Sequence, residues 1–100
     1  MLVKYVDVLQ KHIDCGDRKS ASSCPVAWAV ADAFGCILSD PNCETYVDGC
    51  LITLDAGEFS RRGTPPDVVA DFIECFDVSE EVHPFSFHFE YQETPIGHQD

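Results

Sequence analysis

Residues 24–34 read Cys-Pro-Val-Ala-Trp-Ala-Val-Ala-Asp-Ala-Phe, and this stretch is the clearest helix signal in the chain. Pro25 suits the first helical turn, where its missing N–H costs no hydrogen bond, and Gly35 suits the position after the last turn. Asp32 is the only charge, so the helix is apolar on nearly every side and is expected to be buried. Its alternating alanines permit close approach to a sheet or to a second copy, so a homodimer is one possible assembly.

The segments around this helix have strand and loop patterns. Residues 2–9 combine β-branched and aromatic residues with partial alternation, which predicts a strand, and Gly16 is expected to end one helical turn after it. Residues 17–23 are polar and serine-rich, as in a loop. A short strand is expected at 36–39.

A hairpin is predicted in the middle of the chain. Residues 44–47 and 50–54 flank Asp48-Gly49, a pair favoured in type I′ turns. We expect residues 56–63 to form a loop after this hairpin.

The last third of the chain predicts a second helix and a final strand. Thr64 is expected to cap the helix, with Pro65 in its first turn. Residues at helical spacing form its core face: Val69, Phe72, Ile73 and Phe76. Aromatic and polar residues alternate over 85–91, which predicts a strand with one dry face, and the chain is expected to fray from Gln92.

The predicted fold is α+β. The expected order is β-α-β-β-α-β, giving a mostly antiparallel sheet of three or four strands with two helices packed on one face. The 100 residues, of which 45% are apolar, suit a single domain over 1–100.

The charge is strongly negative. Eighteen acids face six bases, for a net charge of −12, and residues 63–100 hold nine acids and no base. Such a field repels nucleic acid and anionic membranes, so we expect neither as a direct partner. It attracts basic protein surfaces, and it also simply favours solubility.

The absence of a signal peptide or membrane-span pattern predicts a cytoplasmic protein. No stretch approaches the length of a membrane span, and the first residues lack the apolar run of a signal peptide. The six cysteines are therefore expected to be reduced. Their spacing lacks the paired knuckles of a zinc site, so neither a metal nor another cofactor is expected.

Cys24 raises one enzymatic alternative. A thiol at a helix N-terminus can become a reactive thiolate, and His12 is the nearest candidate base in sequence. A nucleophile also needs an orienting third group, which no pattern here supplies. We therefore expect a packed helix start at Cys24 and no catalytic residue, with a redox or hydrolytic thiol as the alternative.

Two charged clusters are candidate binding sites. Carboxylates follow one face of the second helix and the residues after it: Asp67, Asp71, Glu74, Asp77, Glu80 and Glu81. Such a row can imitate the phosphate backbone of a nucleic acid and so bind a basic partner. Alternatively, it is an ordinary solvated helix face. The alternative site binds a small anion or nucleotide signal through the first helix N-terminus and the scattered bases: Arg18, Lys19, Ser22, Ser23, Arg61 and Arg62.

Four short motifs carry a family resemblance. They are His12-Ile13-x-x-Gly16, Cys24-Pro25-Val26-Ala27, Pro66-x-Val68-x-x-Phe72-Ile73-x-x-Phe76-Asp77 and Val82-x-Pro84-Phe85-Ser86-Phe87. In this order they resemble short uncharacterised proteins of double-stranded DNA phages and prophages, although the hairpin region has no counterpart. The resemblance implies a phage setting and the host cytoplasm, and it supplies no activity or catalytic residue.

Small acidic phage proteins often neutralise host defences, including CRISPR effectors. By analogy with that class, the leading hypothesis is an inhibitor that binds a basic surface of a host nucleic-acid-handling protein, acting as a DNA mimic.

Overall fold

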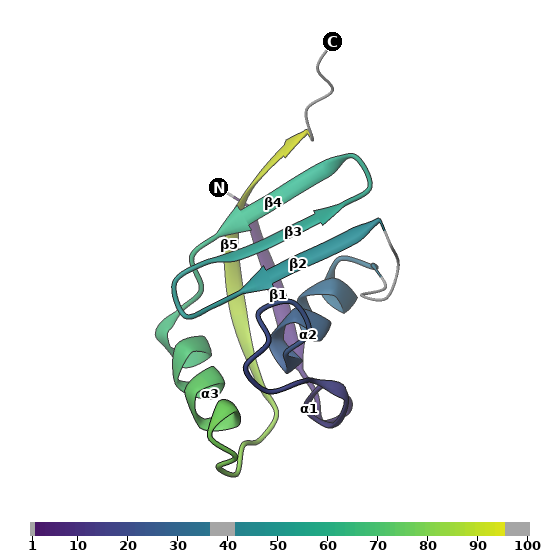
Figure 1. Ribbon diagram of the computed structural model, residues 1–100. Coiled ribbons are helices and arrows are strands. Elements are labelled where there is room, and N and C mark those ends of the chain that lie inside the picture. Colours follow the sequence, from purple (N-terminus) through teal and green to yellow (C-terminus); the bar gives the residue numbers. More distant parts are fainter. Residues whose placement is uncertain (1, 37–41, 96–100) are drawn as a thin grey trace.

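Over the residues that the structure describes, the chain folds into an α+β domain with a five-stranded antiparallel sheet and three helices (Figure 1). The computed structural model describes residues 2–36 and 42–95. In chain order the elements are β1 (Leu2–Val8), α1 (Gln10–Cys15), α2 (Pro25–Ala33), β2 (Cys43–Val47), β3 (Ile52–Ala56), β4 (Phe59–Gly63), α3 (Asp67–Asp77) and β5 (Phe85–Pro95). The strands lie in the order β1-β5-β4-β3-β2, and each neighbouring pair is antiparallel.

Helix α2 packs against both edges of this sheet. It contacts β1 and β2, which are the two end strands, and Figure 1 shows it between them. The sheet therefore curls around the helix. This arrangement explains why α2 is apolar on nearly every side, since six of its nine residues are buried.

Large side chains fill the space between α2 and the central strands. Phe89 on β5 is fully buried, and its ring centroid lies 6.3 Å from that of Phe34, just after α2. Tyr91 contacts the same ring edge-on at 5.1 Å. Ile52 and Leu54 on β3 complete this part of the core without exposed surface. Such edge-on aromatic pairs add to the stabilisation that burial of the rings provides.

The other two helices occupy different places. Helix α1 packs on α2, whereas α3 contributes Val69, Phe72 and Phe76 to the core. The Phe72 ring lies 4.8 Å from that of Phe85 on β5. Figure 1 shows α3 apart from the α1–α2 pair. Helices α1 and α2 thus form one pair and α3 lies elsewhere, and the structure does not confirm the two helices packed on one face of the sheet that the sequence pattern predicts.

The count of three or four strands is wrong because β4 lies in the segment expected to loop out. Gly57 adopts a left-handed conformation, with φ of 64°, which permits a two-residue turn between the paired residues Ala56 and Phe59. Arg61 and Arg62 follow within β4 and pair across to both β3 and β5. Two adjacent arginines hide the alternation that marks a strand.

The β2–β3 hairpin also differs from expectation. The backbone N–H of Asp48 donates to the carbonyl of Leu51 at 2.9 Å, so the turn is centred on Gly49 and Cys50 and not on the predicted pair Asp48-Gly49. The carboxylate of Asp48 instead accepts the N–H groups of Cys50 and Leu51, at 2.7 and 2.8 Å. Together with the hydroxyl of Tyr46, these donors lower the pKa of Asp48, with the Cys50 N–H contributing most. The turn is therefore fixed by a side chain rather than by a left-handed glycine.

Other element boundaries shift by a few residues. Thr64 does not cap α3: Pro66 occupies that position, and no side chain there caps the helix. The predicted fraying from Gln92 is wrong for the next three residues, because the chain up to Pro95 pairs with β4. The strand expected at 36–39 falls largely outside the described residues.

Candidate functional site

The carboxylates of α3 form a row on its solvent side. Asp67, Asp71 and Glu74 are exposed, while Val69 and Phe72 on the other side are buried. At a rise of about 1.5 Å per residue, the three acidic positions span about 10 Å along the helix. None of the three forms an ion pair within the described part of the chain. They therefore present uncompensated negative charge on an anchored helix.

The remaining members of the predicted row are engaged or displaced. Asp77 accepts the backbone N–H of Lys19 at 2.8 Å. The helix ends at Asp77, and Ser79 takes a left-handed conformation, so Glu80 and Glu81 do not continue the helical spacing. Glu81 lies 3.7 Å from a ring nitrogen of His83. Three of the six carboxylates thus form the exposed helical row, which we call the α3 acidic row: Asp67, Asp71 and Glu74.

The four predicted cations have different partners. Arg18 donates to the carbonyl of Phe76 at 3.1 Å and lies over its ring, at the end of α3. Arg61 instead lies over Phe34, with its centre 4.7 Å from the ring centroid, and pairs with Glu93 at 2.8 Å. Lys19 is exposed beside α3, and Arg62 is exposed on β4. These interactions do not gather the cations into the single positive spot that the anion-binding alternative requires.

Cys24 lies in an environment that opposes activation. The side chain is 3% exposed, and burial raises the pKa of its thiol despite nearby backbone N–H groups. His12 has both ring nitrogens occupied: Nδ1 accepts the N–H of Leu9 at 2.9 Å, and Nε2 lies 2.6 Å from the Asp32 carboxylate. The histidine therefore links α1 to α2 instead of serving the thiol.

Alkylation of the folded protein is expected to spare Cys24. Cys15 and Cys50 are exposed and should react with iodoacetamide first, which mass mapping of a time course near neutral pH will show. The two exposed thiols serve as internal controls for reagent activity. Fastest modification at Cys24 would reopen the case for a reactive thiol.

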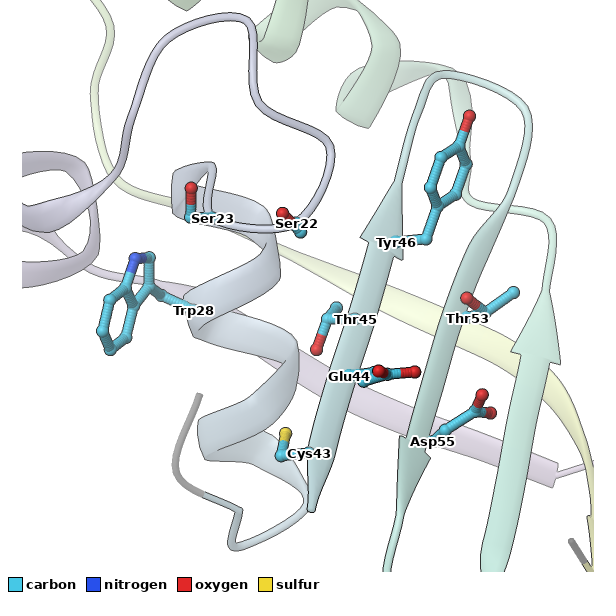
Figure 2. Close-up of a pocket in the computed structure, with 9 residues that line it drawn as sticks. All are labelled: Ser22, Ser23, Trp28, Cys43, Glu44, Thr45, Tyr46, Thr53 and Asp55. Carbon is cyan, nitrogen blue, oxygen red and sulfur yellow. The ribbon is translucent and has the colours of Figure 1, made fainter. Parts of the chain in front are cut away.

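A cavity of about 580 Å³ lies along β2 (Figure 2). Its volume is within the range of small-ligand and peptide sites. The lining comes from the loop before α2, from α2, and from β2 and β3: Ser22, Ser23, Trp28, Cys43, Glu44, Thr45, Tyr46, Thr53 and Asp55.

Only two of the predicted site residues, Ser22 and Ser23, line this cavity. Its charged members are Glu44 and Asp55, and no lysine or arginine is among them, which suits a cation better than the predicted anion. One sequence signal was available for this site. Thr45 is a polar residue at a buried position between Cys43 and Val47, on the otherwise apolar face of β2.

Metal and membrane features are absent from the parts of the chain at 2–36 and 42–95. No group of three or more metal-ligating side chains comes together there. None of the helices described is long and apolar enough to cross a membrane.

Comparisons of the chain with protein-family models, with curated proteins and with solved structures found no match. The function is therefore argued from the geometry of the surface and the cavity.

Proposed function

We propose that this chain is a small acidic binding protein of phage type, which docks on a basic surface of a host nucleic-acid-handling protein in the host cytoplasm and inhibits it. The observation that supports this function is the α3 acidic row, whose three carboxylates are exposed and lack counter-ions in the described structure. The proposal needs no catalytic residue and no cofactor.

The physical basis is competition for a phosphate-binding surface. Buried Val69, Phe72 and Phe76 anchor α3, so the backbone that carries its outer carboxylates is already ordered before a partner binds. A partner surface that binds phosphates has lysines and arginines, which would attract the same carboxylates. The net charge of −12 would also speed the encounter with a basic partner.

A displacement assay tests this function. Basic nucleic-acid-binding proteins of a bacterial host are each loaded with a short fluorescent duplex, and the chain is titrated in while anisotropy is followed. We expect displacement from at least one of them at about 0.1 M salt. Direct binding of the chain to that protein, measured without the duplex because high salt releases the duplex by itself, should weaken toward about 1 M salt, where the Debye length shrinks to about 3 Å. Charge reversal of the α3 acidic row, as D67K/D71K/E74K, should abolish displacement, because each introduced lysine would repel the lysines and arginines of the partner surface.

A matched control changes the same net charge elsewhere. Asp14, Glu58 and Glu90 are exposed acids on other parts of the chain, and D14K/E58K/E90K should keep most of the displacement. Thermal unfolding of both variants checks that each is folded. Equal loss in both variants would mean that overall charge, and not the α3 acidic row, makes the contact. No displacement from any panel member would count against the function itself.

A further inference from the structure

One face of the sheet is left open at β2 and β3 in the described structure. Side chains of the opposite face, such as Ile52 and Leu54, are buried in the core that α2 and α3 complete. Side chains alternate along a strand, so the residues between these point outward. The outward residues of β2 are exposed, and those of β3 are partly exposed. We call this surface the β2–β3 outer face: Glu44, Tyr46, Thr53 and Asp55.

Two carboxylates on the β2–β3 outer face oppose each other. Glu44 and Asp55 are direct partners in the strand register, and like charges at such positions repel. The base on the adjoining strand, Arg62 opposite Thr53, forms no ion pair with either of them within the described residues. Asp55 Oδ1 is also buried there without a hydrogen-bond partner. A cation brought from outside the chain would relieve this repulsion.

The neighbouring Tyr46 supplies an aromatic surface. Its side chain is 45% exposed, and its hydroxyl donates to the carboxylate of Asp48 at 2.9 Å, which fixes the direction of the ring. Tyr46 lines the cavity along β2 together with Glu44 and Asp55, and Figure 2 shows Tyr46 and Asp55 directed away from α2. The ring therefore stands beside both opposed carboxylates on the open side of the sheet.

An aromatic ring beside carboxylates suits arginine better than lysine. The planar guanidinium stacks on an aromatic face and donates to carboxylates through a rigid fork of N–H groups. The lysine ammonium is a compact and strongly hydrated charge, so it gains less from the ring.

The β2–β3 outer face continues into the α3 acidic row. A Cβ on Gly49, the residue after Asp48, would lie 3.0 Å from the Cβ of Ala70 on α3. Ala70 directly precedes Asp71, a member of the row. Figure 1 shows the β2–β3 connection next to α3. One basic partner surface can therefore contact the row and the outer face together.

We propose that the β2–β3 outer face binds an arginine side chain of the basic partner. The guanidinium lies on the Tyr46 ring and donates to the carboxylates of Glu44 and Asp55, while Asp48 holds the ring in place. This inference rests on the proposed function and adds the side chain that the partner contributes. A second copy of the chain suits this face less, because it would bring the same carboxylates.

Short peptides test the face without any host protein. The probes are a capped glycine-rich hexapeptide with two arginines and its lysine and citrulline versions, followed by amide NMR spectra at about 0.02 M salt, where screening is weak. Wild type is compared with D67N/D71N/E74Q, which removes the charge of the α3 acidic row. In both proteins we expect saturable shifts at the outer face with the arginine peptide, with Kd of about 1–10 mM. The lysine peptide should bind at least about twofold more weakly, and the uncharged citrulline peptide should give no saturable shift.

Variants separate the ring from the charges. Tyr46→Leu should remove the preference for arginine over lysine, whereas Tyr46→Phe keeps the ring and should retain it. E44Q/D55N should weaken the arginine peptide about fivefold without lowering the thermal midpoint, because it also removes the like-charge repulsion. D14N/E90Q, at exposed acids elsewhere, is the matched control for net charge and should change the affinity by less than about twofold.

Several results would overturn this inference: no saturable shift with the arginine peptide, equal shifts with the citrulline peptide, and unchanged arginine binding in both Tyr46→Leu and E44Q/D55N. Sedimentation tests the other occupant, since a concentration-dependent dimer that Tyr46→Leu dissociates would assign the face to a second copy. Displacement of a duplex by the wild type together with any of these failures would leave the proposed function standing. Arginine binding without displacement from any panel member would instead count against the function and keep the arginine site.

Discussion

Gly63→Ala is expected to lower the free energy of unfolding by about 3 kcal/mol. Gly63 ends β4, and a Cβ at this position would collide with the backbone carbonyl oxygen of Glu90 and approach the Phe89 ring to 2.9 Å. The carbonyl belongs to β5, the strand between β4 and β1, so it cannot move without disturbing the sheet. Urea unfolding followed by circular dichroism measures the loss.

Ser60→Ala is the control in the same strand, and it should change stability by less than about 0.5 kcal/mol. A second comparison identifies the colliding atom. Because the nearest contact is backbone, adding Phe89→Leu to Gly63→Ala should give no rescue. Full rescue by the shorter side chain would show that the ring, and not the carbonyl, limits the space.

Phe89→Ala is expected to cost about 3–5 kcal/mol, a large share of the total stability of a domain this size. Phe89 is fully buried, and its ring contacts Phe34 and Tyr91. Phe34 directly follows α2 and Tyr91 lies on β5, so these contacts join the end of the helix to the middle of the sheet. Truncation therefore leaves a cavity that neither layer can close by a small shift.

Thermal unfolding of Phe89→Ala and Phe59→Ala tests this account. Phe59 is 41% exposed on β4, so its truncation should cost no more than about 1 kcal/mol. Equal losses for the two variants would contradict the assignment of Phe89 to the centre of the core.

The sequence predicted those elements whose local patterns agree with their surroundings. The stretch around Pro25 was predicted as a buried helix because it is apolar on all sides, and the structure confirms α2 with Gly35 in a left-handed conformation after it. The aromatic alternation from Phe85 likewise predicted β5, whose Phe87 and Phe89 are buried.

Elements fixed by long-range contacts were missed. β4 has little apolar pattern of its own and exists because β3 and β5 pair with it on either side. The sheet order is equally hidden, since nothing local indicates that β1 pairs with β5.

The same distinction, between local sequence patterns and long-range contacts, applies to the two candidate sites. Helical spacing alone placed Asp67, Asp71 and Glu74 on one exposed face. The β2 cavity is lined by Trp28 from α2 and by Thr45 from β2, which are 17 positions apart in sequence and border one cavity only because α2 packs beside β2. A single-sequence pattern does not contain that contact.

The strand order has a consequence during synthesis. In the described sheet β1 pairs with β5 alone, and Asp7 and Ser86, which face each other in this pair, are 79 positions apart. At about 5–20 residues per second, the nascent β1 waits about 4–16 s for that partner. Until then Val6 and Val8, which are fully buried in the fold, lack the cover that β5 provides, and the backbone of β1 has no pairing strand.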